Sequence, residues 1–246
     1  MNDPLNQAIK QLKLGWMLDN YEHELAESAR KSRTSHDLLL RLCGGEIEAR
    51  RARAIDRKVR AAKLPAVRTI EDFDWTWPKH INKEKVRHLF TFDFMRHCQN
   101  VIIVGTVGLG KTHIAVALAS QACQNGCNVL FTPAVDIINT LAEAQADGNL
   151  RKAIKRYIRP QILIIDELGY LPVDRVGAEL LFQVLGSRYE KASTVITTNR
   201  KYADWSKTFA NDATLTSAVL DRVLHHSETI VITGESYRMK DRIDND

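Results

Sequence analysis

The chain has 246 residues, 44% of them hydrophobic and 26% charged, and its net charge is +5. This length and composition predict one full folded domain plus a smaller one, and they exclude large-scale disorder. No stretch reaches the roughly 20 apolar residues that a membrane span requires, and the N-terminus lacks the apolar core of a secretory signal, so we expect a cytoplasmic protein with no membrane partner.

The cysteines do not form a metal-binding pattern. They are scattered, and a zinc site would need two more well-spaced ligands beside the one pair that shares a helical face. We therefore expect buried free thiols at Cys43, Cys98, Cys123 and Cys127.

The positive charge is concentrated near the N-terminus. Residues 1–70 contain 14 basic and 9 acidic residues, whereas the rest of the chain contains 21 of each. The densest part, residues 50–63, has seven basic residues and one acid. Two interpretations of this segment remain open: a surface that binds a polyanion, or a solvated helix face. The outward basic residues include Arg51, Arg57 and Lys58.

Helices are predicted throughout the N-terminal part. Apolar residues at spacings of three to five predict amphipathic helices over residues 4–31. A further helix begins near residue 34, and we expect Gly44-Gly45 to break it. A basic helix then runs from Glu46 to just before Pro65. These elements form a small all-α domain over residues 1–63, with roles in DNA binding, partner binding or self-assembly.

Residues 64–98 are predicted to be a linker that precedes the main domain, over residues 99–246. The linker carries an aromatic cluster of Phe73, Trp75 and Trp77. Two roles are equally consistent with this cluster: part of a pocket for an adenine base, or packing of the linker onto the core.

From residue 99 onward, short apolar strands alternate with helices, which predicts an α/β fold with a parallel sheet covered on both faces. Two helices, 134–146 and 149–158, separate the second strand from the third, one more than a minimal nucleotide-binding unit needs. The five expected strands are 101–104, 128–132, 161–165, 193–198 and 228–232. The second of the two helices carries Arg151, Lys152, Lys155, Arg156 and Arg159.

A phosphate-binding loop follows the first of these strands. Its glycines let backbone N–H groups converge on phosphate oxygens at the start of a helix. Lys111 supplies a charge for the β- and γ-phosphates, and the Thr112 hydroxyl can bind the accompanying Mg²⁺. The loop consists of Gly105, Thr106, Val107, Gly108, Leu109, Gly110, Lys111 and Thr112.

An acidic pair follows the third strand. The carboxyl ends of parallel strands meet at one edge of the sheet, which places Asp166 and Glu167 beside the phosphate-binding loop. We expect Asp166 to hold Mg²⁺, and Glu167 to orient and deprotonate the attacking water.

Three further residues are candidates for the same chemistry. Asn199 ends the fourth strand, where an amide could bind the γ-phosphate or the attacking water, or simply form a turn. Arg222 ends a helix and therefore lies far from its own nucleotide, so it either reaches the site of a neighbouring subunit or forms an intrachain ion pair. Arg238 could add a second arginine to the phosphates. Only 14 residues follow Ile232, too few for a C-terminal helical lid.

At this point the sequence resembles a known family. Gly-x-x-Gly-x-Gly-Lys-Thr-His at 105–113 and Ile-Ile-Asp-Glu-Leu-Gly-Tyr at 164–170 combine with Thr-Thr-Asn at 197–199, Asp-Arg at 221–222 and Glu-Ser-Tyr-Arg at 235–238. The set is similar to the IstB-like transposition helper ATPases, AAA+ proteins of bacterial insertion sequences that are related to DnaC-type helicase loaders. The likeness extends over nearly the whole chain.

The resemblance implies an AAA+ ATPase that uses ATP and Mg²⁺. It implies a homo-oligomer with ATP sites between subunits, which assembles on duplex DNA and assists a transposase. It also implies that Asn199 is the first sensor, that Arg222 acts in trans and that Arg238 is the second sensor, with the basic helix at 149–158 facing DNA. One departure is Thr106, where the family commonly has proline.

Three alternatives remain open. A helicase loader would share the fold but hold single-stranded DNA. A small-molecule kinase would need an arginine-rich lid over its own site, which this sequence does not offer. A scaffold that binds ATP without hydrolysing it would be unaffected by Glu167→Gln.

Overall fold

The computed structural model describes residues 3–239, in two compact units that meet between Arg57 and Lys58. The predicted linker at 64–98 is packed into the second unit. It forms helices α4 (Lys83–Leu89) and α5 (Asp93–Arg96), whose residues Val86, Leu89 and Phe94 are buried in the main core. Their apolar side chains explain why this segment is an integral part of the unit.

From residue 3 onward, the first unit contains α1 (Pro4–Gln11), α2 (Gly15–Arg30) and most of α3 (Ser35–Ala61), whose last residues, from Lys58 on, belong to the second unit. The expected break at Gly44-Gly45 is wrong, because α3 continues through both glycines. A Cβ at Gly45 would lie 2.2 Å from the ring of Trp16, whereas nothing lies within 4 Å of one at Gly44. Gly45 is therefore a contact site for the Trp16 ring of α2, and that packing compensates for the low helix propensity of glycine.

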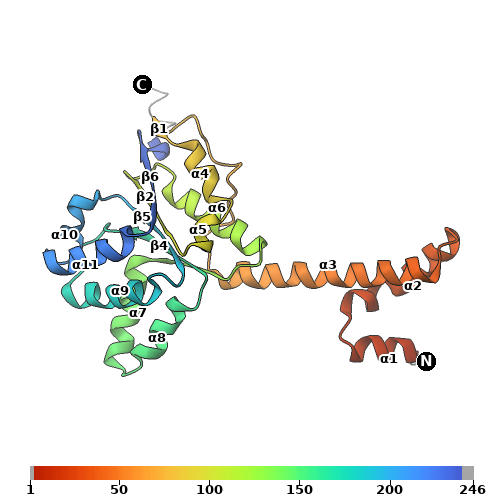
Figure 1. The fold of residues 1–246 in the computed structure, drawn as a ribbon. Helices are drawn as coiled ribbons and strands as arrows, with labels where there is room; N and C mark the ends of the chain where they lie inside the picture. Colours follow the sequence, from red (N-terminus) through yellow and green to blue (C-terminus); the bar gives the residue numbers. More distant parts are fainter. Residues whose placement is uncertain (1–2, 240–246) are drawn as a thin grey trace. The chain divides into compact units, whose positions relative to one another are not determined.

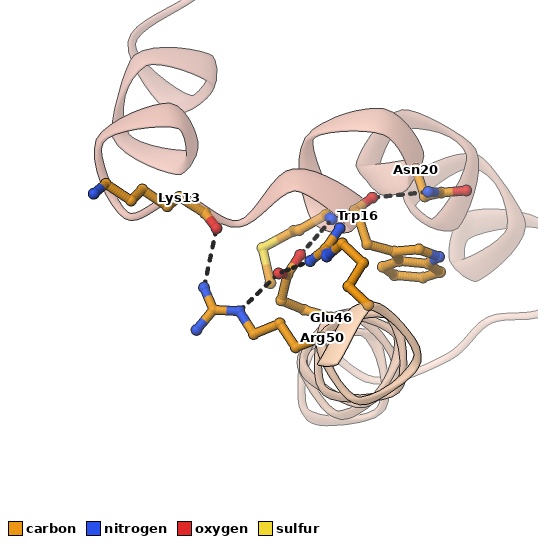
Figure 2. Close-up of polar contacts among 7 residues, drawn as sticks. Lys13, Trp16, Asn20, Glu46 and Arg50 are labelled. Atoms are coloured by element: carbon orange, nitrogen blue, oxygen red, sulfur yellow. Dashed lines mark hydrogen bonds and ion pairs between the residues drawn. The ribbon is translucent and has the colours of Figure 1, made fainter. Parts of the chain in front are cut away.

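Glu46 joins the helices of this unit through polar contacts, which Figure 2 shows. Its carboxylate is buried and accepts hydrogen bonds from Arg50 Nε at 2.9 Å, Arg53 at 3.1 Å and the Met17 amide at 3.2 Å. Helix α2 has no side-chain cap of its own, so Glu46 supplies one. Burial opposes ionisation, but the bonds from Arg50 and the α2 amides hold the pKa of Glu46 below its ordinary value. Arg50 and Arg53, from the basic segment at 50–63, are thus paired with Glu46 within the first unit.

The second unit contains a six-stranded sheet in the order β1-β6-β2-β5-β4-β3. The five predicted parallel strands are confirmed. A two-residue strand, β1, adds an antiparallel edge against β6, and it is too short to produce an alternation in the sequence. The strands are β1 (His80–Ile81), β2 (Asn100–Gly105), β3 (Val129–Pro133), β4 (Ile162–Leu168), β5 (Ser193–Thr198) and β6 (Ser227–Thr233).

Helices cover both faces of this sheet, as Figure 1 shows. One core lies between the sheet and α6, α4 and α5, and the other between the sheet and α7, α9 and α11. Strand β2 serves both, since Val101 and Ile103 enter the first core and Ile102 the second. The remaining helices are α6 (Lys111–Gln124), α7 (Ala134–Ala146), α8 (Leu150–Ile158), α9 (Arg175–Arg188), α10 (Trp205–Thr208) and α11 (Ala213–Leu224), with 3₁₀ turns at Tyr202–Asp204 and Tyr237–Met239.

Arg188 ends α9 and is almost completely buried. Its guanidinium donates hydrogen bonds to the carbonyl oxygens of Tyr157 and Pro160, both at 2.9 Å, and to that of Ser193 at 2.5 Å. Burial lowers the pKa of Arg188 to about 10. The side chain satisfies carbonyl groups at the end of α8 and the start of β5, which is a structural role remote from the phosphate-binding loop.

The cysteines are less uniform than expected. Cys123 is buried, and burial raises the pKa of its thiol to about 11. Cys43 of α3, however, is exposed. Cys98 and Cys127 are half-buried. Within residues 3–239, no helix combines the length and the apolar character that a bilayer span demands.

Candidate nucleotide-binding site

The phosphate-binding loop connects the end of β2 to the start of α6. Gly108 and Gly110 both have φ of +81°, a left-handed conformation that favours glycine. A Cβ at Gly108 would lie 2.0 Å from Ser236 Oγ, and one at Gly110 would lie 2.5 Å from the Phe73 ring. Gly110 is also the N-cap of α6 and offers no side-chain acceptor, so the first amides of the helix are available to an anion.

The Lys111 side chain folds back onto the phosphate-binding loop. Its Nζ donates a 2.7 Å hydrogen bond to the carbonyl oxygen of Thr106. Burial lowers the pKa of Lys111, against the attraction of the carboxylates of Asp166 and Glu167. A partly desolvated ammonium group in this position is suited to bind phosphate oxygens.

Asp166 and Thr112 are brought together, as the sequence predicts for a metal site. Thr112 Oγ1 lies 3.0 and 3.1 Å from the two carboxylate oxygens of Asp166 and donates to them. Asp166 is buried at the end of β4, and the Thr197 hydroxyl of β5 also donates to it. Carboxylate and hydroxyl oxygens are the hard ligands that Mg²⁺ prefers, so these residues fit the ion.

Glu167 has an unusual backbone conformation. Its φ is +58°, and the pairing of β4 with β5 shifts register between Ile165 and Leu168. A non-glycine residue in this region costs about 1–3 kcal/mol, a strain found at functional sites. The Glu167 amide donates to Thr197 Oγ1 at 3.0 Å, while the side chain is exposed and lines the cavity described below.

Thr197 is a site residue that sequence reasoning missed. Its hydroxyl contacts both members of the acidic pair, yet in the sequence it is one β-branched residue of a buried strand. Two signals were available: the Thr-Thr-Asn motif at 197–199, to which it belongs, and its place near the carboxyl end of β5, beside the strand that carries Asp166.

Asn199 lies just after β5 and lines the same cavity. Its Oδ1 is buried, and no residue within 3–239 hydrogen-bonds to it. An unsatisfied buried amide costs about 1–3 kcal/mol, so this atom is placed for a ligand or a bound water.

A cavity of about 560 Å³ opens over the phosphate-binding loop. Phe73 packs on Gly110 and Trp75, as expected if this segment packs onto the core, and it also lines the cavity with Trp77. A role of these rings in binding adenine stays a prediction. His113 Nε2 lies 2.9 Å from the Thr69 carbonyl oxygen and fixes this segment to α6. The volume and mixed lining match those of small-ligand sites.

The segment after β6 closes one side of the cavity. The Tyr237 amide donates to the Gly108 carbonyl oxygen at 2.9 Å, and Trp77 Nε1 donates to that of Glu235 at 2.9 Å. Arg238 is exposed and lines the cavity, where its charge is one of those acting on the pKa of Lys111. The structure therefore brings Arg238 into the site.

Arg222 lies outside the cavity, on α11. Its guanidinium stacks 4.3 Å from the centroid of the Phe182 ring and donates to the Ala218 carbonyl oxygen at 3.1 Å. Both contacts are within one unit and leave the side chain half-buried.

The predicted DNA-binding residues differ in their surroundings. The basic residues of α8 are exposed, with Arg156 resting against the ring of buried Tyr157. Lys58 is half-buried rather than outward, because its Nζ donates to Gly126 O at 2.5 Å and Asn128 Oδ1 at 2.9 Å. The exposed residues are Arg51, Arg57, Arg151, Lys152, Lys155 and Arg156.

Solved structures of the same fold include a DnaC helicase loader, with a TM-score of 0.56 and 23% identity over 72% of this chain and 99% of that one. Another is the replication initiator DnaA bound to AMPPCP and single-stranded DNA, with a TM-score of 0.59 and 19% identity over 74% of this chain and 56% of that one. At these identities the likeness shows the fold, that of AAA+ domains.

Two curated proteins share more of their sequence with this chain than these solved structures do. The chain is 38% identical to the IS21 ATP-binding protein of Pseudomonas aeruginosa, over 97% of this chain and 89% of that protein. It is 35% identical to the IS5376 ATP-binding protein of Geobacillus stearothermophilus, over 98% and 96%. The family model for the IstB-like ATP binding protein matches residues 7–245. The chain therefore belongs to the IstB-like family, whose relatives here are ATP-binding proteins of insertion sequences.

Proposed function

We propose that this protein is a Mg²⁺-dependent ATPase of a bacterial insertion sequence, which assembles on duplex DNA in the cytoplasm and assists the transposase. The observation that carries the ATPase proposal is the cavity over Gly108 and Gly110, which gathers Lys111, Glu167 and Asn199 at one edge of the sheet. Half-buried Thr112 at the start of α6 donates to buried Asp166 of β4, next to the loop that would hold a triphosphate.

Each residue has a defined task. The loop amides and Lys111 bind the β- and γ-phosphates, and Thr112 and Asp166 hold Mg²⁺, which supplies charge neutralisation on the phosphate oxygens. Glu167 accepts the proton of the attacking water, and Asn199 orients that water or the γ-phosphate. Thr197 is a positioning residue, because it fixes both carboxylate-bearing residues without reaching the cavity.

Two arginines complete the proposed reaction. Arg238 acts on the phosphates of its own subunit. Arg222 acts on those of a neighbour, because it lies on α11 and outside its own cavity. An arginine supplied in trans is worth about 10³–10⁵ in turnover, so hydrolysis should depend on assembly.

DNA binding is proposed for the exposed basic side chains of α8, with Arg51 and Arg57 as further contacts. Contacts of this kind reach phosphates, so binding should be weakly sequence-dependent and strongly salt-sensitive. The relatives named for insertion sequences favour a transposase as partner over a replicative helicase.

The ATPase proposal is tested by comparing Glu167→Gln with Glu179→Gln. Glu179 is exposed on α9 and is paired with Arg175, so its loss should leave hydrolysis unchanged. Glu167→Gln should abolish DNA-stimulated phosphate release while ATP binding persists. If the parent chain binds ATP but releases no phosphate above background under any DNA condition, the protein is an ATP-binding scaffold instead.

A further inference from the structure

Two histidines and a glutamate form a cluster at the end of the sheet opposite to the phosphate-binding loop. Glu190 follows α9, and His225 and His226 follow α11 just before β6 begins. Their metal-binding atoms all lie within 4.8 Å of one another, and all three side chains are exposed. Imidazole and carboxylate groups at such spacing are a ligand set for Zn²⁺ and similar ions.

The distance between His226 and Glu190 suits a shared ion better than a direct bond. His226 Nε2 lies 3.7 Å from Glu190 Oε1, longer than a charge-assisted hydrogen bond of about 2.7–2.9 Å. Two ligands on tetrahedral Zn²⁺ at about 2.0–2.1 Å lie about 3.4 Å apart. The rings of His225 and His226 have centroids 4.1 Å apart, so a small rotation of exposed side chains completes the set.

Tyr189 contacts the His225 ring of this cluster. Its hydroxyl lies 2.7 Å from His225 Nδ1. When the ring proton is on Nδ1, His225 donates it to this hydroxyl, and the Nε2 lone pair is then free for a metal ion. Metal-binding histidines are commonly held in this way by an oxygen acceptor on the other ring nitrogen.

The backbone on both sides of the cluster is fixed. The Asn100 amide of β2 donates to the His226 carbonyl oxygen at 2.7 Å. The amides of Lys191 and Ala192 donate to the Arg188 carbonyl oxygen at 2.9 and 3.1 Å. The ligands thus extend from two anchored segments.

We propose that Glu190, His225 and His226 bind one Zn²⁺ ion, with water completing the coordination. This site is separate from the Mg²⁺ ligands Thr112 and Asp166. The ion would tie the end of α9 to the end of α11. Because His225 is three residues after Arg222, the ion would also restrict the helix that carries this arginine, a consequence that rests on the proposed function.

The test is a titration of the full chain with Zn²⁺ against a chromophoric chelator, without nucleotide, Mg²⁺ or DNA. The expected result is one saturable site per chain. His225→Ala and His226→Ala should each weaken binding about 100-fold or more, and Tyr189→Phe should weaken it about 10-fold. His97→Ala is the matched control, because His97 is an exposed histidine at the end of α5 that is not part of the cluster, and its loss should change nothing.

Co²⁺ absorption distinguishes this site from the thiols. Histidine and carboxylate ligation gives visible d–d bands without sulfur-to-cobalt charge transfer, and Cys123, whose raised pKa keeps it protonated, should not contribute. The proposal is overturned if the chain shows no saturable site, or if the His225→Ala/His226→Ala double variant binds Zn²⁺ as the parent does. Neither readout requires ATP binding, so failure of this site is distinguishable from failure of the proposed function.

Discussion

The Thr197 hydroxyl donates a hydrogen bond to the buried carboxylate of Asp166. The same oxygen accepts from the Glu167 amide at 3.0 Å. One side chain of β5 therefore sets the position of the metal-binding carboxylate and of the residue proposed to activate water. A single change at this position therefore affects both members of the acidic pair at once.

Thr197→Val keeps the shape of the side chain and removes both hydrogen bonds. We expect kcat to fall about tenfold or more and the Mg²⁺ concentration for half-maximal activity to rise, since hydrogen bonds to charged groups contribute about 1.5–3 kcal/mol. The Mg²⁺ dependence is the informative readout, because a purely structural loss would not move it. Thr194→Val, at the other end of the same strand, is the control, and an identical Mg²⁺ curve for Thr197→Val and the parent chain would contradict the assigned role.

Lys111→Met should remove ATP binding yet stabilise the nucleotide-free chain. Burial lowers the pKa of Lys111 from its ordinary value of 10.5, so the folded state binds fewer protons there than the unfolded state. This lysine therefore destabilises the fold most at neutral pH, and the penalty fades as pH rises towards 10.5.

Thermal unfolding of both chains at several pH values checks this expectation. At pH 7 the Tm of Lys111→Met should exceed that of the parent chain, and this Tm difference is the readout. It should shrink as the pH is raised. A Tm difference that grows with pH would contradict the lowered pKa of Lys111.

The two glycines of α3 form a matched pair. Gly45→Ala places a methyl group 2.2 Å from the Trp16 ring and should destabilise the first unit by about 1–3 kcal/mol. Gly44→Ala meets nothing within 4 Å and should stabilise the helix by about 0.5–1 kcal/mol. Urea unfolding followed by Trp16 fluorescence and by helical circular dichroism measures both, and equal effects would refute the packing argument.

Arg222 is tested by mixing two inactive variants. Arg222→Ala should lose most DNA-stimulated ATP hydrolysis, as should Glu167→Gln. If Arg222 acts in trans, an equimolar mixture rebuilds active sites at the interfaces where an intact Glu167 meets an intact Arg222, about one-quarter of the total. The measurement is phosphate release by the mixture, and no recovery would place the role of Arg222 within its own subunit.

Strong local patterns made much of the fold predictable. The parallel strands and helix α7 have clear apolar periodicity, and the phosphate-binding loop has a motif whose glycines are needed for backbone conformation. The features that the sequence did not reveal depend on contacts between distant residues. Trp16 against Gly45 and Met17 with Glu46 are separated by 29 residues each, and Lys58 contacts a loop about 70 residues further on.

Some residues of the candidate site could likewise be predicted from the sequence, and others could not. Phosphate and Mg²⁺ chemistry prescribes residue types at fixed places along the chain, so the sequence is enough to identify Lys111, Thr112 and Asp166. The role of Thr197 could not be predicted from the sequence, since a threonine in a buried strand usually indicates only β propensity. Its role arises from its register against β4, which no local pattern encodes.

The central claim is assembly on DNA that ATP controls, and particle size on random-sequence duplex DNA tests it most directly. We predict that ATP, unlike ADP or no nucleotide, produces large salt-sensitive complexes, and that Lys111→Ala and Arg222→Ala both abolish them. Glu179→Gln should assemble as the parent chain does. A chain that stays monomeric and does not bind duplex DNA in any nucleotide state would contradict the account, and a preference for single-stranded DNA would point to helicase loading.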